Sequence, residues 1–281
     1  MMDIGLQIFS VKNALKEDYV GTLERIAAIG YKHVEFPVRI TDEGIHLGGD
    51  ITVKELKRQL DRLGLKTIST SARVNQDTAW DRIIEVNQEL DCPVIVCPAA
   101  YFTDKANVIE YCGRFNRYAE TCRKQGIGLY YHNHFQEFQV FEGHTVMDLM
   151  LEHMDEELVK FELDSYWALR GGADPAEWLH KYGTRCDRIH QKDLPAGVNP
   201  VNWFDVFGKD ERITVEHLYK TQDPSQFAEI GEGIMDIKNI IDTARKIGAA
   251  KYMIVEQDAT CKTELESVEI SYRNMSVLLA L

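Results

Sequence analysis

The sequence lacks the features that mark secreted, membrane-spanning and disulfide-bonded proteins. Its first residues, MMDIGLQIF, contain no basic segment followed by an apolar core, so no signal peptide is expected. The longest apolar stretch, about residues 93–102, is interrupted by Pro98 and is too short to span a bilayer. We therefore expect a cytoplasmic protein that has no membrane partner.

Closely spaced cysteines are also missing. The chain has no Cys-x-x-Cys motif, and this spacing favours buried, reduced thiols over a disulfide framework. The six cysteines are scattered along the chain: Cys92, Cys97, Cys112, Cys122, Cys186 and Cys261.

Basic residues are in deficit. The chain has 32 Lys and Arg against 45 Asp and Glu, a formal net charge of −13. A field of that sign repels phosphodiester backbones, so nucleic acid is not expected as a partner. No Gly-rich phosphate loop is evident, which favours an unphosphorylated small molecule as the substrate. The hydrophobic fraction of 44% is ample for a full-sized core.

Short runs of β-branched and aromatic residues recur along the chain, the first seven about every 30 residues. Amphipathic segments such as TLERIAAIG and KELKRQLDRLG fill the gaps, and glycines end several of them. This alternation predicts a single (β/α)8 TIM barrel over residues 1–281. An open doubly wound sheet is the alternative, but no GxGxxG follows the first run. The predicted strands are 3–9, 33–36, 65–70, 93–97, 127–132, 159–163, 187–191 and 252–256.

One long gap interrupts this regular alternation after the seventh predicted strand. It runs from about residue 194 to residue 233 and is rich in Pro, Gly, Asn and Asp. Loops at the carboxyl ends of barrel strands carry function in such folds. We predict that this segment is a long loop over the barrel mouth that shapes or covers a site there.

Polar side chains follow four of the predicted strands, at the point where each strand ends. In a barrel of parallel strands these positions face the same mouth. Two carboxylates and two imidazoles converging there predict a divalent metal site. The alternative is that each residue caps a helix or pairs with a nearby Lys or Arg. This alternative is weaker because such residues follow three consecutive strands, the sixth, seventh and eighth. The four residues are His132, Asp164, His190 and Glu256.

Two further residues are candidates for catalysis. Glu137 follows the fifth strand and is a candidate general base, since a carboxylate in an apolar cleft can have a tuned pKa. The alternative is a solvent-exposed acid. Lys192 could hold a substrate oxygen or stabilise an enediolate; it could equally form a salt bridge with Asp193 or Glu232.

Four more residues are candidates for substrate binding. His134 shares one face of an extended chain with His132, although a hydrogen-bonded cluster that locks the turn is the alternative. Gln7 and Glu35 face the mouth if the strand alternation holds. Trp167 could form an apolar wall for a sugar ring, but a tryptophan there is as often part of the core.

Seven segments carry a resemblance to a known family: GLQIFSVKNAL, GYKHVEF, YYHNHFQEF, FELDSYW, HQKD, GEG and IVEQD. In this order they resemble the xylose-isomerase-like sugar phosphate isomerase/epimerase family, which includes inosose dehydratases, ketose 3-epimerases and, more distantly, apurinic-site endonucleases. The resemblance spans nearly the whole chain. It implies a single barrel with one divalent cation, usually manganese, magnesium, cobalt or zinc, at the C-terminal mouth.

The resemblance also implies roles for individual residues. Asp164, His190 and Glu256 match metal ligands of the family, and His132 stands where the family usually has a fourth, glutamate ligand. An imidazole there favours zinc, cobalt or manganese over magnesium. Glu137 lies near the offset of the glutamate that transfers protons in the epimerases.

Two departures separate the chain from the ketose 3-epimerases in the narrow sense. Trp167 stands where those enzymes carry a substrate-binding histidine, and Lys192 is the nearest cation to their missing arginine. We therefore expect a metal-dependent isomerase, epimerase or dehydratase of a sugar, cyclitol or keto-sugar that works through an enediolate, in a possible homodimer. A non-catalytic sugar-binding barrel, suggested by His132, is one alternative. A phosphodiesterase of the apurinic-endonuclease type is another, disfavoured by the net charge of −13.

Overall fold

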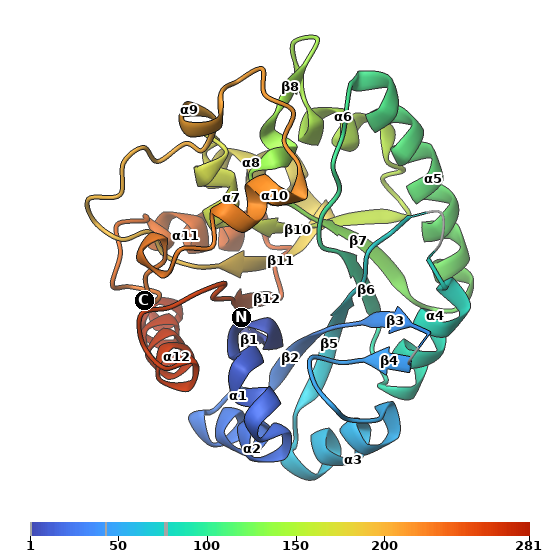
Figure 1. Cartoon of the computed structure of the whole chain (residues 1–281), viewed down its shortest axis with the longest axis vertical. Helices are drawn as coiled ribbons and strands as arrows, with labels where there is room; N and C mark the ends of the chain where they lie inside the picture. The colour runs from blue at the N-terminus through green and yellow to red at the C-terminus, as the bar shows by residue number, and fades with distance from the viewer. Residues whose placement is uncertain (1, 43, 76–77) are drawn as a thin grey trace.

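The computed structural model describes residues 2–42, 44–75 and 78–281. Eight parallel strands close into a barrel in the order β1-β12-β11-β10-β7-β6-β5-β2 (Figure 1). The predicted (β/α)8 barrel is confirmed, and each predicted strand corresponds to one barrel strand. Their bounds are β1 (Asp3–Gln7), β2 (His33–Pro37), β5 (Lys66–Ser71), β6 (Val94–Cys97), β7 (Gly128–His132), β10 (Val159–Asp164), β11 (Cys186–Gln191) and β12 (Tyr252–Val255).

Most helices surround the strands on the outside of the barrel, and two short ones, α9 (Phe204–Phe207) and α10 (Val215–Lys220), lie in the segment that follows β11 (Figure 1). The other helices are α1 (Lys12–Glu17), α2 (Tyr19–Ile29), α3 (Val53–Leu63), α4 (Trp80–Glu89), α5 (Lys105–Lys124), α6 (Val146–His153), α7 (Ser165–Arg170), α8 (Pro175–Tyr182), α11 (Ile237–Ile247) and α12 (Glu264–Ala280). Two short antiparallel pairs that the sequence did not predict also occur: β3 (Arg39–Thr41) with β4 (Gly44–His46), and β8 (Val140–Phe141) with β9 (His144–Thr145).

The ends of several helices follow from local sequence. The Thr52 side chain accepts a hydrogen bond from the Glu55 N–H at the start of α3, as N-cap threonines do. Gly64 ends the same helix with a φ of 68°, a left-handed conformation that glycine adopts without steric cost. These caps fix where each helix gives way to the next strand.

Alternation along each strand separates the barrel interior from the layer between strands and helices. On β7, Tyr131 packs outward, with ring centroids 6.3 Å from Tyr111 and 5.9 Å from Phe115 of α5. Its neighbour Tyr130 belongs instead to a separate buried cluster with Val94 and Val96. His132 lies on the same strand face as Tyr130, which directs it to the interior.

Gly5 on β1 shows how tightly the interior is filled. A Cβ at this position would lie 3.2 Å from Ile254 Cγ1 and 3.3 Å from Ile68 Cδ1. A side chain on Gly5 would therefore require these two residues to move. At the level of Gly5 the barrel interior is therefore filled by side chains, as in other barrels of this kind.

The segment after β11 is folded rather than extended. It contains α9, α10 and the 3-10 turn Pro224–Gln226. Phe204 and Phe207 of α9 pack against Phe135, with centroid distances of 5.8 and 5.9 Å. The Phe227 ring lies 6.0 Å from that of Trp167. The segment thus contacts the loop after β7 and helix α7 after β10; that it covers a site at the mouth remains a proposal.

All six cysteines are free thiols, and five are buried as predicted. The expectation of burial is wrong for Cys261, which is exposed in the turn before α12. Among the described residues, no helix combines the length and apolar character needed to cross a bilayer.

Candidate active site

Four side chains converge at the carboxyl ends of four neighbouring strands. His132 and Asp164 end β7 and β10, His190 is the next-to-last residue of β11, and Glu256 directly follows β12. One donor atom from each residue lies within 4.8 Å of the others, and all four side chains are buried. The structure therefore brings together the four residues that the sequence predicted as metal ligands.

Asp164 uses its two carboxylate oxygens differently. Oδ1 accepts the N–H of Trp167 at 2.7 Å and so caps α7. Oδ2 lies 3.9 Å from His132 Nε2, on the side of the cluster. The capping role and the site role thus coexist. The Asn133 side chain fixes the spacing of the two strand ends, because it donates to the Asp164 carbonyl and accepts from the Asp164 N–H, each at 3.1 Å.

Glu162 contacts both histidines from behind. Its Oε2 lies 3.2 Å from His132 Nδ1 and 3.2 Å from His190 Nε2. An N–H on His132 Nδ1 that donates to Glu162 leaves His132 Nε2 turned toward Asp164, while His190 Nδ1 lies 3.0 Å from Glu256 Oε2. Glu162 was not predicted as a site residue, although it stands two residues before Asp164 and therefore shares its face of the strand.

Gln7 and Glu35 lie deeper than predicted. Gln7 Nε2 donates to Glu35 Oε1 at 2.5 Å, and the Ser69 hydroxyl donates to Glu35 Oε2. Glu35 Oε1 in turn lies 3.5 Å from His190 Nε2. Both side chains are nearly inaccessible to solvent, and their hydrogen bonds are to protein groups. In this position they support His190 and Glu162 from below; direct contact with a substrate remains a prediction.

Lys192 lies inside the cluster. Its ammonium donates hydrogen bonds to Asp164 Oδ2 and Glu256 Oε2, and it lies 3.5 Å from Asp258 Oδ2. The side chain has no solvent exposure. The sequence left Asp193 and Glu232 open as salt-bridge partners, but the ammonium pairs with the cluster carboxylates instead. Asp258 was not predicted as a site residue; it lies beyond the end of β12, two residues after Glu256.

The charges of the cluster shift the pKa values of its members. Burial alone would lower the pKa of His190, but Glu162, Glu256 and Glu35 raise it well above its usual value. Burial lowers the pKa of His132 far below its usual value, and the neighbouring His190 and His134 add to this effect. Lys192 and His190 outweigh burial and hold the pKa of Glu256 well below its usual range. The His132 imidazole is thus neutral and can donate a nitrogen lone pair to a metal ion.

Glu137 is fully buried, and it lies on the outer side of β7, next to Tyr131. Tyr131, which points outward from β7, donates to its Oε1 at 2.7 Å, and the His134 N–H donates to its Oε2 at 2.8 Å. Burial raises the pKa of Glu137 to about 7. The predicted alternative of a solvent-exposed acid is therefore wrong. The hydrogen bonds of Glu137 run to the outer layer and not to the four-residue cluster, so its role as a base stays a prediction.

His134 and Trp167 lie beside the cluster. The His134 ring is 5.0 Å from His132 and 5.5 Å from Trp167 between centroids. Burial lowers the pKa of His134 to about 3, so this imidazole is neutral near pH 7. Trp167 is fully buried, and the Lys192 ammonium lies over its ring, 5.9 Å from the ring centroid. Trp167 thus forms part of the packing around the site, and its contact with a sugar ring is a prediction.

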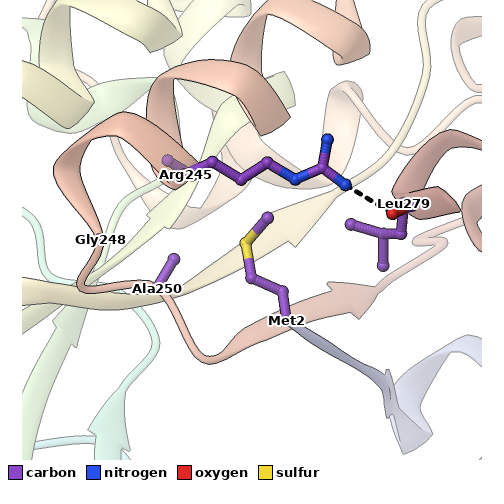
Figure 2. Close-up of a pocket in the computed structure, with 6 residues that line it drawn as sticks. Met2, Arg245, Gly248, Ala250 and Leu279 are labelled. Atoms are coloured by element: carbon purple, nitrogen blue, oxygen red, sulfur yellow. Dashed lines mark hydrogen bonds between the residues drawn. The ribbon is translucent and has the colours of Figure 1, made fainter. Parts of the chain in front are cut away.

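Two clefts lie elsewhere. One of about 340 Å³ is formed by Met2, the end of α11 and the end of α12, where Arg245 donates to the Leu279 carbonyl at 2.5 Å (Figure 2). None of the six residues that line it carries a carboxylate or imidazole, and it lies at the amino ends of β1 and β12. The other, about 230 Å³, lies beyond β5 and β6 and includes Ala100, whose N–H is 3.4 Å from Glu137 Oε1.

The donor set of the cluster fits a divalent transition metal. Histidine nitrogens and carboxylate oxygens are both zinc ligands, and the carboxylate oxygens also suit manganese. Glu162 behind both imidazoles is the kind of outer partner that orients such ligands. The residues that could hold the ion are His132, Asp164, His190 and Glu256.

Comparisons with known proteins agree with the barrel fold. Over residues 23–276 the sequence matches the family described as xylose isomerase-like TIM barrel. A stretch of 79 residues is 38% identical to an inosose dehydratase from Geobacillus kaustophilus (strain HTA426). That match covers 28% of this chain and 25% of the relative, so it spans about a quarter of the relative's length.

Solved structures extend the comparison to the whole chain. A sugar phosphate isomerase/epimerase from Parabacteroides distasonis ATCC 8503 superposes with a TM-score of 0.77 and 26% identity, over 99% of this chain and 94% of the other. The IOLI protein, solved with a bound zinc atom, superposes with a TM-score of 0.74 over 99% of this chain and 98% of the other. Its identity of 13% makes this a likeness of fold.

Proposed function

The chain belongs to the xylose isomerase-like TIM barrel family, and on that premise we propose that it is a divalent-metal-dependent isomerase, epimerase or dehydratase acting on a sugar, cyclitol or keto-sugar. The observation that carries the proposal is the convergence of His132, Asp164, His190 and Glu256 at the barrel mouth. The similarity to a sugar phosphate isomerase/epimerase and, over part of the chain, to an inosose dehydratase supports this substrate class.

The four cluster residues would hold the cation. When bound, it would polarise a substrate carbonyl and the adjacent hydroxyl and so make the proton on the carbon next to the carbonyl more acidic. Glu162 would keep the ring nitrogens of His132 and His190 turned to the ligand side through its contacts of 3.2 Å.

The protein groups would then move the proton. Glu137, with a pKa raised by burial to about 7, is our proposed base, and a carboxylate of the cluster is the alternative. Lys192 and His134 would hold the oxygens of the resulting enediolate. Return of the proton to the opposite face gives an epimer, return to the neighbouring carbon gives an isomer, and loss of a β-hydroxyl gives a dehydrated product.

Solvent deuterium uptake tests this proposal. Purified protein with manganese, cobalt or zinc is incubated in D2O with a panel of ketohexoses, ketopentoses and inososes, and exchange at carbon is followed by NMR. We expect exchange with at least one substrate. Failure of all substrates to exchange with the metal-loaded protein would contradict the proposed proton transfer.

Glu137→Gln separates the base from the metal site. We expect metal content to be unchanged and exchange to be lost, whereas full exchange in this variant would assign the base to another carboxylate. Glu229→Gln is a matched control, because Glu229 is also buried and pairs with Lys262 rather than with the cluster.

A sugar-binding barrel without catalysis is the second candidate. The observation that favours it is the pairing of Lys192 with Asp164 and Glu256, which neutralises two of the four ligands from within the protein. It predicts sugar binding by calorimetry with no carbon exchange in D2O at any metal concentration.

A further inference from the structure

Lys192 and the four-residue cluster use the same carboxylate oxygens. The ammonium donates to Asp164 Oδ2 and Glu256 Oε2. The same Oδ2 lies 3.9 Å from His132 Nε2, and the same Oε2 lies 3.0 Å from His190 Nδ1. These are the atoms that would face a cation held by the cluster.

An ammonium and a divalent cation cannot both occupy this position. Both are positive, and within a buried site their repulsion is only weakly screened. Lys192 cannot escape to solvent either, because its side chain is fully buried. A buried charge without a partner is strongly unfavourable, so the ammonium needs another carboxylate close by.

Asp258 offers that second position. Its Oδ2 lies 3.5 Å from the Lys192 ammonium, and the side chain is 6% exposed. Within the part of the chain that the structure describes, this oxygen has no hydrogen-bond partner. A small movement of the Lys192 side chain would give Asp258 a donor and free Asp164 and Glu256.

We infer that Lys192 is a built-in competitor of the metal ion, and that metal binding displaces its ammonium from Asp164 and Glu256 to Asp258. The inference rests on the proposed function, since it assumes that the cluster binds a divalent cation. The lysine keeps the two buried carboxylates paired in the metal-free protein, at the expense of metal affinity. Metal binding would then also deliver the ammonium to a new place in the site.

Calorimetric titration with Mn²⁺ of wild type and three variants tests the competition. Lys192→Met should bind Mn²⁺ about tenfold tighter or more, because the competing charge is gone. Asp258→Asn should bind about tenfold more weakly while Lys192 is present. In the double variant, the effect of Asp258→Asn should shrink to about threefold or less, because no ammonium needs the second position.

Lys12→Met is the matched control. The Lys12 ammonium also lies near Asp258, where it donates to the backbone carbonyl at 2.6 Å, but it has no hydrogen bond to Asp164 or Glu256. Its removal should change the Mn²⁺ affinity by less than about threefold if contact with the two ligands, and not general positive charge, is what matters.

The outcomes separate this inference from the proposed function. If wild type binds Mn²⁺ and Lys192→Met binds no tighter, the competition is wrong and the metal-dependent function stands. If only Lys192→Met binds, the competition is supported and the wild type is not metal-dependent. If neither binds, both proposals fail.

A structural readout covers the case in which Lys192→Met does not fold. Lys192→Gln, whose amide can still donate to a carboxylate, then replaces it in the titration. In a crystal structure of the wild type with Mn²⁺, the Lys192 ammonium is expected on Asp258. An ammonium that stays on Asp164 and Glu256 beside the bound ion would overturn the inference.

Discussion

A single buried oxygen, Glu162 Oε2, lies close to both imidazoles of the cluster. It lies 3.2 Å from the rear nitrogen of His132 and 3.2 Å from that of His190. Outer partners of this kind typically account for about 10–100-fold in metal affinity. Burial and the neighbouring Glu35 raise the pKa of Glu162 well above its usual value, so loss of its charge is the smaller change and loss of its oxygen the larger.

We therefore predict a graded response at Glu162. Glu162→Gln keeps an acceptor and should weaken Zn²⁺ binding about tenfold, whereas Glu162→Leu removes it and should weaken binding about 100-fold. Calorimetric titration measures both. Glu229→Gln, another buried glutamate, should leave the affinity unchanged. Equal effects of all three substitutions would show that general destabilisation, and not imidazole orientation, is responsible.

The pH dependence of exchange tests whether Glu137 is the base. Burial raises the pKa of Glu137 to about 7, and the Tyr131 hydroxyl at 2.7 Å lowers it by donating to the carboxylate. A base must be ionised, so deuterium uptake should rise with pH through about 7. Tyr131→Phe removes the donor, raises the pKa and should move this rise to higher pH.

The readout distinguishes catalysis from packing. A general loss of stability in Tyr131→Phe would lower the rate at every pH without moving the midpoint of the rise. Phe115→Leu is the control. Phe115 packs against the Tyr131 ring in the same aromatic layer, but its side chain cannot donate a hydrogen bond to Glu137. A midpoint that Tyr131→Phe does not move would remove Glu137 from the mechanism.

At the scale of elements, Asp193 ties the strand β11 to the segment before α11. Its carboxylate accepts the N–H groups of Gly231, Gly233 and Met235, at 2.9, 3.0 and 3.0 Å. The same carboxylate also accepts a hydrogen bond from the N–H of the next residue, Leu194, at 2.8 Å. A Cβ on Gly233 would lie 2.3 Å from Asp193 Oδ1, so glycine is required for this close approach.

Asp193→Asn should therefore destabilise the fold. The amide presents N–H groups to backbone donors and leaves buried N–H groups without acceptors, a loss of roughly 2–3 kcal/mol in the free energy of unfolding. Urea denaturation measures it. Asp242→Asn, on the exposed face of α11, should cost less than about 0.5 kcal/mol. Equal midpoints for the two variants would contradict a tethering role.

The elements also show how far sequence reasoning reaches. The barrel strands were predictable because β-branched runs alternate with amphipathic helices, and polar residues at their ends identified His132, Asp164, His190 and Glu256. The residues that support these four from behind, such as Glu162, were not predictable in this way. Glu162 shares its strand face with Asp164, but it lies inside β10 and not at its end, where polar residues were predicted to form the site. Contacts between strands, such as that of Lys192 with Glu256, depend on how the strands are arranged in the closed barrel. The local sequence of a strand does not specify this arrangement.

At the scale of the whole molecule, net charge and metal stoichiometry decide between sugar chemistry and a phosphodiesterase. Both donor clusters of the described residues include His190, so they are not independent sites. In the inner cluster of Glu35, Glu162 and His190, both Glu35 carboxylate oxygens already accept hydrogen bonds, from Gln7 and Ser69. We therefore predict about one metal ion per chain by elemental analysis, lost in Asp164→Ala. About three ions, together with DNA binding at physiological salt despite the charge of −13, would favour the phosphodiesterase.

Metal binding should also stabilise the entire barrel. The cluster joins β7, β10, β11 and β12, so a cation held there links half of the closed sheet and is lost on unfolding. A ligand at about 100 times its Kd adds about 2.7 kcal/mol to the free energy of unfolding, which for a chain of this size raises Tm by roughly 5 °C. Scanning calorimetry with and without Zn²⁺ measures the shift. Asp164→Ala should abolish it, and Lys192→Met should enlarge it at the same Zn²⁺ concentration, because tighter binding increases the linkage. A shift that survives Asp164→Ala would place the stabilising ion somewhere other than at the barrel mouth.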